Sequence, residues 1–347
     1  MQHNAFIDLI ERKYLSTPTN FRPFDFAKKI QYFTLDAIID VAFGTPFGCI
    51  AQDDDTYDYI KTVGQLLPAA VVAGVLPWLL TSSRSFVFKS FLPTEKDKLG
   101  FGKRIQLRSN RVAKGIVAKR FGESKEVQND MLGSFIAHGL TQEEANSETL
   151  LQLMGDRIAG TDTTAQAIRA MLLHITTSPT SHTALQAAID EGVKIGKIYS
   201  PVTDTGAKAI PYLQAAIKEG LQKFPVSAGL LPKTMPEGGD IINGFGIPAG
   251  IDISVTLITI THSKTTFGPD AHIFRPERWL ECDDTDKLRK MTLTADLVFE
   301  SGKWSCSGNN IAMVGIGKIL VEASFFDRRK SNRLTPKSYL EDLTYPW

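Results

Sequence analysis

Apolar residues recur at helical spacing along most of this chain, and glycine-rich or polar stretches separate the periodic segments. The clearest periodic segment spans residues 26–43, with Asp25 as a helix N-cap and Gly44 just beyond the last turn. Its apolar positions lie three or four residues apart and predict one buried face made of Ile30, Phe33, Ala37, Ile38 and Val41. A short amphipathic helix is predicted over residues 6–12.

Two further helices are defined by their ends. Thr141 and Glu144 form a capping box, and the pattern behind them predicts a helix over residues 141–176, about 50 Å long at 1.5 Å per residue. Pro211 can occupy a first helical turn, and Pro225 disfavours a helical backbone at the residue before it. These prolines predict a helix of about three and a half turns between them.

The pattern changes between residues 238 and 255. Glycines punctuate this stretch, and Ile251, Ile253 and Val255 alternate with other residues, which predicts a β-hairpin. The fold class is therefore mainly α with a small β portion. Residues 326–347 are mostly polar and lose periodicity, which predicts a divergent tail without regular structure.

Composition narrows the function classes. The chain has 347 residues, of which 43% are hydrophobic and 22% charged, a profile typical of a globular protein with a sizeable core. Its 39 basic and 38 acidic residues nearly balance, so charge favours neither nucleic acid nor an anionic surface as a partner, and small apolar molecules are better candidates. Three widely separated cysteines argue against a disulfide framework and a cysteine-rich zinc site.

The most apolar stretch covers residues 64–80 and contains Pro68 and Pro77. It is shorter than the ~20 residues that a spanning helix needs. It predicts either a buried helix hairpin or a lip that lines an apolar entrance or contacts a bilayer. No leader or anchor is readable at the N-terminus, so the sequence predicts a cytoplasmic or peripheral protein.

The long predicted helix contains an unusual cluster, Ala159-Gly160-Thr161-Asp162-Thr163-Thr164. Glycine costs about 1 kcal/mol in a helix interior, and Thr and Asp prefer caps and turns. The cluster could relay protons through a hydroxyl and a carboxylate, or widen the helix where a small ligand sits. The alternative is a structural irregularity in which threonine hydroxyls bond back to carbonyls.

A second cluster lies near the C-terminus, where Cys306 stands between Gly302 and Gly308 and precedes a segment of helical character, residues 309–322. A helix N-terminus favours the thiolate form of cysteine, which is the form that binds metals. Both glycines allow backbone conformations with positive φ and close approach of the backbone to a large flat cofactor. The alternative for this segment alone is a structural cysteine in a glycine-rich loop.

Five motifs follow one another along the chain: the AGTDTT cluster, a helix with Glu219 and Gln222, the hairpin, the segment FRPERW at 274–279 and the loop FESGKWSCSG at 299–308. In this order they resemble the motif set of the cytochrome P-450 family, the haem-thiolate monooxygenases. The resemblance covers residues 6–322, and it is strongest to the fungal branch that includes pisatin demethylase. It implies one incomplete cytochrome P-450 domain over residues 1–347, with a long central helix and a haem-ligand cysteine loop.

The resemblance also implies roles for particular residues. Cys306 would be the axial ligand of haem b, within a loop that includes Phe299, Gly302 and Gly308, and Asp162 and Thr163 would deliver protons. Three groups complete this assignment: Lys233 and Trp304 as haem-propionate partners, Glu219, Gln222 and Arg278 as a buried network, and Ile158, Ala159, Val226 and Leu230 as substrate-lining residues.

The implied partners are dioxygen, a small apolar substrate and an NADPH-dependent cytochrome reductase, so that NADPH acts only indirectly. The family resides at the endoplasmic-reticulum membrane, and residues 64–80 would border the access channel there. The implied function is hydroxylation or demethylation of a small molecule in fungal secondary metabolism.

The chain also departs from the family pattern. It begins in what resembles the middle of the fold, Gln222 stands where the family has arginine, Glu300 replaces a glycine of the cysteine loop, and the tail differs from the family's closing hairpin. Gln222 is still expected to hydrogen-bond Glu219. The alternative function is therefore a truncated, catalytically inactive remnant that binds haem poorly or not at all.

Overall fold

The computed structural model of the protein describes residues 2–17, 19–56, 58–61, 63, 64, 72, 113–122, 129–146, 157–228 and 232–331. The chain divides into two compact units, Met1–Ala165 and Gln166–Trp347, with the boundary inside one helix. In the described ranges, no helix is both long and apolar enough to cross a bilayer. Apart from Gly64 and Val72, the apolar stretch 64–80 lies outside the described residues.

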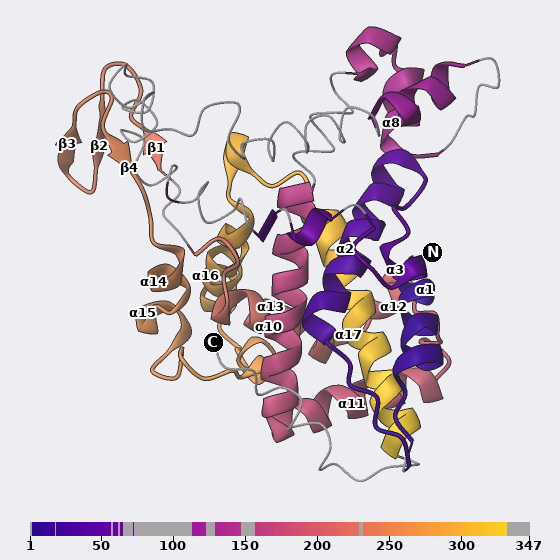
Figure 1. Cartoon of the computed structure of the whole chain (residues 1–347). Coiled ribbons are helices and arrows are strands. Elements are labelled where there is room, and N and C mark those ends of the chain that lie inside the picture. The colour runs from indigo at the N-terminus through magenta and orange to yellow at the C-terminus, as the bar shows by residue number, and fades with distance from the viewer. Residues whose placement is uncertain are drawn as a thin grey trace. The chain divides into compact units, whose positions relative to one another are not determined.

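The first unit is helical and is arranged around one long helix (Figure 1). In its described part, the elements with defined bounds are α1 (Gln2–Leu9), η1 (Ile10–Tyr14), α2 (Phe26–Phe43), α3 (Cys49–Gln52), α8 (Met131–Ala137) and the π-helical turn η2 (Arg157–Asp162). Both predicted ends of α2 are confirmed. The Asp25 carboxylate accepts a hydrogen bond from the Lys28 N–H at 2.9 Å, and Gly44 ends the helix at φ +69°.

The buried surface of α2 is wider than the predicted stripe. Ile30 and Phe33 are buried as expected, but Val41 is 40% exposed, so its assignment to the core was wrong. Four elements contact α2, namely α1, α3, α8 and η2. Because they surround it on more than one side, residues outside the predicted stripe, such as Leu35 and Ile39, are buried as well.

The second unit is a helical assembly with two small sheets (Figure 1). Its helices are α10 (Thr163–Thr177), which begins just before the boundary, α11 (Pro179–Lys194), α12 (Asp204–Lys208), α13 (Pro211–Lys223), α14 (Leu257–Thr261), α15 (Lys264–Phe267), η3 (Pro276–Trp279), α16 (Thr285–Asp296), η4 (Leu297–Phe299), η5 (Gly302–Trp304) and α17 (Asn309–Ser331). Helix α13 contacts α11, α16, α17 and η3 and so lies at the centre of this unit.

Close backbone approach explains one glycine in α13. A Cβ on Gly220 would lie 2.3 Å from the Cγ of Met171 in α10, a distance that real side chains do not tolerate. Gly220 therefore lets α10 and α13 pack directly on each other. The predicted ends of α13 are confirmed, because the helix begins at Pro211 and ends at Lys223.

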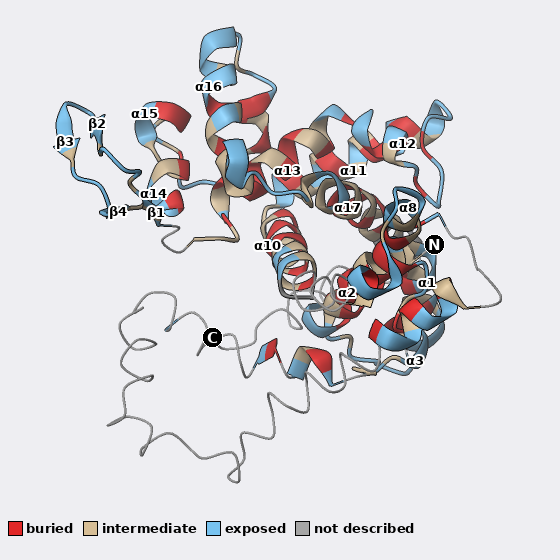
Figure 2. Ribbon diagram, turned by 90° about the horizontal axis from the view of Figure 1, so that it is seen from above, coloured by how far each residue is buried: buried red, intermediate tan, exposed pale blue. Residues whose placement is uncertain are grey.

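The β portion is small, as predicted. Among the described residues, β2 (Asp240–Ile242) pairs with β3 (Phe245–Ile247), and β1 (Lys233–Thr234) pairs with β4 (Asp252–Ile253), both antiparallel. Figure 2 shows β2 and β3 as largely exposed. The short pairing of β1 with β4 places β1, and with it Lys233, at the base of the hairpin.

The capping box at Thr141 and the C-terminal tail concern two predicted helix boundaries. The capping box forms, because Thr141 and Glu144 exchange hydrogen bonds. Helix α10 ends at Thr177, within one residue of the predicted end, and the turn before it is π-helical. Residues 147–156, which the prediction places in the same helix, lie outside the described residues. Helix α17 continues to Ser331, so the first six residues of the expected tail are helical, and residues 332–347 are not described.

Candidate active site

The loop before α17 holds Cys306 at the entrance to a helix of 23 residues. The Cys306 N–H donates to the Phe299 carbonyl at 2.8 Å, and the Asn309 N–H donates to the Cys306 carbonyl at 3.4 Å. These bonds fold the loop back on itself and leave the thiol free and exposed. The Cys306 thiol therefore lies three residues before the first residue of α17, at the N-terminal end of that helix.

The two loop glycines behave differently. Gly302 uses the conformational freedom of glycine, with φ +60°, whereas Gly308 does not adopt a positive φ. A Cβ on Gly308 would lie 3.7 Å from the Cys306 Sγ. Glycine at this position therefore leaves space beside the thiol, and the helix that begins at Asn309 explains its ordinary φ.

Glu300 has a backbone conformation that glycine adopts much more readily. Its φ is +59° and its ψ is −172°, a region almost restricted to glycine because a Cβ meets the neighbouring backbone. This backbone conformation suits the glycine that the family pattern has where this chain has Glu300. Because the Phe299 carbonyl is held by the Cys306 N–H, the loop has little room to relieve this strain.

Lys233 and Trp304, the two residues expected to face cofactor carboxylates, lie together. The Lys233 Nζ lies 4.7 Å from the centre of the Trp304 ring, a cation–π contact, and the Lys303 Nζ lies 5.1 Å from the same ring. The Lys233 Nζ also lies 3.4 Å from the Glu300 carboxylate. The structure thus brings β1 and the cysteine loop together around one charged cluster.

The buried network predicted around Glu219 and Arg278 is present. Both side chains are almost fully buried, and the Arg278 Nε donates to both Glu219 oxygens, at 3.1 and 2.9 Å. The Arg275 N–H and the Trp279 Nε1 donate to the same carboxylate at 2.7 and 2.8 Å. Burial raises the pKa of the Glu219 carboxyl, while the Arg275 hydrogen bond and the Arg278 charge act in the opposite direction.

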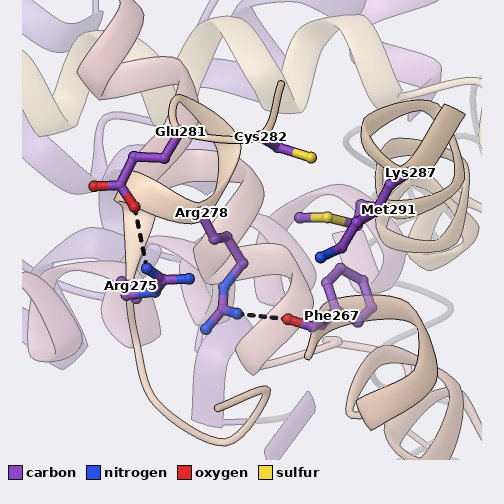
Figure 3. Close-up of a pocket in the computed structure, with 7 residues that line it drawn as sticks. All are labelled: Phe267, Arg275, Arg278, Glu281, Cys282, Lys287 and Met291. Carbon is purple, nitrogen blue, oxygen red and sulfur yellow. Dashed lines mark hydrogen bonds and ion pairs between the residues drawn. The ribbon is translucent and has the colours of Figure 1, made fainter. Parts of the chain in front are cut away.

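The remaining guanidinium nitrogens of Arg278 are also bonded. They donate to the Asp270 carboxylate and to the carbonyls of Phe267, Asp270 and Ile273. Figure 3 shows Arg278 directed at the Phe267 carbonyl and Arg275 at Glu281, on the wall of a cavity of about 150 Å³. That volume is below the ~300 to 1,000 Å³ of typical ligand pockets, so the network is structural.

Gln222 makes different contacts from those expected. Its amide donates to the Thr261 and Ala271 carbonyls and makes no hydrogen bond to Glu219, so that expectation was wrong. Its Oε1 is buried and has no hydrogen-bond partner in the described part of the chain. The reason is geometric: Arg278, Arg275 and Trp279 already occupy the Glu219 carboxylate.

The AGTDTT cluster forms η2 and the start of α10. The π-helical turn confirms that the cluster interrupts a regular α-helix, and such turns are frequent at functional sites. The Thr163 hydroxyl donates to the Ala159 carbonyl, and the Asp162 carboxylate accepts from the Gln31 amide at 2.7 Å. Sequence reasoning missed Gln31, because it lies 131 positions away and carries no motif of its own.

The expected substrate-lining residues are only partly described. Ala159 is exposed, Val226 is half-buried, only the backbone of Ile158 is described, and Leu230 lies outside the described residues. Asp162 belongs to the first unit and Cys306 to the second. The surroundings of Asp162 and of Cys306 are therefore described separately, each within its own unit.

These features define a class: a mainly helical chain with a π-helical Thr-Asp turn, a buried Glu–Arg network and a cysteine loop before a long helix. The family model described as Cytochrome P450 matches residues 4–323. Because the match covers most of the chain, this protein belongs to the cytochrome P450 family, whose members hold haem through a cysteine thiolate.

Curated relatives support the same assignment. The chain is 40% identical over 328 residues to cytochrome P450 monooxygenase ABA1 of Pyricularia oryzae, covering 92% of this chain and 62% of the relative. It is 34% identical to cytochrome P450 monooxygenase abl1 of Leptosphaeria maculans (91% and 54%). It is 29% identical to pisatin demethylase of Fusarium vanettenii (85% and 55%). The chain thus spans about three-fifths or less of the length of these relatives.

Proposed function

We propose that residues 1–347 form one partial cytochrome P450 domain of a monooxygenase that hydroxylates or demethylates a small apolar molecule in fungal secondary metabolism. The observation that carries the proposal is the exposed Cys306 thiol at the N-terminus of α17. The fit to haem b rests on this single soft ligand, on the space that Gly308 leaves beside it, and on the cations near Trp304.

Haem b, when bound, would supply the iron chemistry, and a cysteine thiolate ligand favours cleavage of the O–O bond. Cys306 would bind the iron, and Lys233 with Trp304 would meet the carboxylate edge. The loop residues Phe299 and Gly302 set the direction of the thiol, because the Phe299 carbonyl accepts the Cys306 N–H and Gly302 turns the chain.

Asp162 and Thr163 would handle protons. The Thr163 hydroxyl uses its hydrogen in the bond to Ala159, so its oxygen remains able to accept a further hydrogen bond. The Gln31 amide holds the Asp162 carboxylate in place. Ile158, Ala159, Val226 and Leu230 would border the substrate, and electrons would come from an NADPH-dependent cytochrome reductase.

One observation favours the alternative, a remnant that binds haem poorly. Glu300 is strained and already pairs with Lys233, one of the residues that haem carboxylates would need. The ion pair opposes haem uptake, because a haem carboxylate would have to break the contact between Glu300 and Lys233 in order to bind Lys233. The alternative and the main proposal differ in one measurable property, which is thiolate-ligated haem.

The test is a carbon monoxide difference spectrum of protein expressed with haem supplied and reduced with dithionite. We expect the red-shifted Soret band of a thiolate-ligated ferrous carbonyl. Cys306→Ala should lose the band, whereas Cys282→Ala, which removes a half-buried thiol outside the loop, should keep it. A spectrum without the red shift in the unmodified protein would contradict the proposal and support the remnant.

A further inference from the structure

The charged cluster beside Cys306 contains a carboxylate that belongs to the protein itself. Glu300 lies 3.4 Å from the Lys233 Nζ, and Lys233 in turn lies over the ring of Trp304, a residue that is 57% exposed. The side chains of Glu300 and Lys233 are 27% and 40% exposed, so the ion pair is reachable from solvent. An incoming carboxylate could therefore replace Glu300 at Lys233 without unfolding the loop.

The backbone makes Glu300 a poor choice for a purely structural residue. At φ +59° and ψ −172° any side chain is strained, and the Lys233 contact is the ion pair that the structure shows for this carboxylate. Lys303 stacks on the same Trp304 ring and is a second cation near the site. The cluster thus contains the ammonium groups of Lys233 and Lys303, and Glu300 already forms an ion pair with Lys233.

Building on the proposed function, we propose that Glu300 competes with the carboxylates of haem for Lys233, so that this residue lowers the affinity of the chain for its own cofactor. Haem uptake exchanges one ion pair for another: the Lys233–Glu300 contact breaks and a Lys233–propionate contact forms, with no change in protonation. Free Glu300 is then hydrated, which its partial exposure permits.

The experiment is an equilibrium titration of apoprotein with haemin and, separately, with haemin dimethyl ester, whose carboxylates are blocked. Soret absorbance and tryptophan fluorescence report binding, so enzyme activity is not needed. Glu300→Gln should bind haemin about twofold to fivefold more tightly, the range expected for a partly exposed ion pair, and should bind the ester unchanged. Lys233→Met should weaken haemin binding and abolish the gain when combined with Glu300→Gln.

Glu191→Gln is the matched control, because it makes the same charge change at an exposed ion pair with Lys194. It should leave both titrations unchanged. Equal gains for haemin and its ester in Glu300→Gln, or no gain with haemin, would overturn the competition. Binding that is insensitive to Cys306→Ala in every variant would instead overturn the proposed function, so the two failures are distinguishable.

Discussion

Glu300 shows how one residue can act on both stability and cofactor binding. A non-glycine residue in this backbone region stores about 1 to 3 kcal/mol of strain. A natural sequence keeps such strain only where the surrounding structure holds it, and here the Cys306 N–H to Phe299 carbonyl bond does so. The loop that presents the thiol is therefore formed at a cost in stability.

Glu300→Gly should stabilise the haem-free protein. Relief of the strain is partly offset by the ~0.5 to 1 kcal/mol that glycine costs in unfolded-state entropy, so we expect a gain of about 1 kcal/mol in the free energy of unfolding. Urea denaturation followed by circular dichroism measures it. Glu300→Ala, which removes the carboxylate but keeps Cβ, should show no such gain, and equal gains in both variants would assign the effect to charge.

At the scale of elements, the Glu219 carboxylate joins α13 to the segment around η3. Arg278→Met should lower the free energy of unfolding by about 3 to 5 kcal/mol, because it leaves a buried carboxylate without its cation. Arg275→Met is the matched control three residues away. The Arg275 side chain is 42% exposed in its ion pairs, and we expect a loss below about 1 kcal/mol. Similar losses in the two urea titrations would refute the structural role assigned to Arg278.

Helix α10 carries a pH-dependent contribution. His174 stacks on Phe274 with ring centres 5.2 Å apart, and its pKa is lowered by burial and by the charge of Lys223. The unfolded state therefore binds the proton more readily, so stability is full above the ordinary pKa of ~6.5 and falls as the pH drops below it. One such group contributes a slope of at most about 1.4 kcal/mol per pH unit.

His174→Phe should keep the ring stack and remove this titration. Between pH 7.5 and 5.5, the variant should lose less stability than the unmodified protein in urea denaturation. Part of the slope should remain, because burial also lowers the pKa of His262, which lies near Lys223. An unchanged slope would show that His174 is not the responsible group.

At the scale of the whole molecule, the family match runs across both compact units. If residues 1–347 behave as one domain, unfolding followed by circular dichroism and by tryptophan fluorescence should give coincident transitions. In a Trp78→Phe variant the remaining tryptophans, among them Trp279, belong to the second unit, so fluorescence reports on that unit, and far-ultraviolet circular dichroism reports on helices of both units. Two separated transitions would show that the units unfold independently.

Local rules in the sequence determined much of this protein. Caps at Asp25 and Thr141, the proline at Pro211 and the glycine at Gly44 set helix ends, because each acts through its own backbone or a neighbour within a turn. The order of the motifs likewise determined the family. The family resemblance also identified Glu300 as a replacement for glycine, and its positive φ concerns the backbone of that single residue.

Tertiary structure decided the contacts between distant segments. Three of these contacts join residues far apart in the chain: Gln31 with Asp162, Gln222 with its carbonyl partners, and Glu300 with Lys233. The exposure of Val41 depends on what packs around it. No local pattern encodes such partners, because a side chain's burial and hydrogen bonds depend on which elements the fold places against it. The sequence determined the elements and the family, and packing decided how this chain's own residues occupy the site.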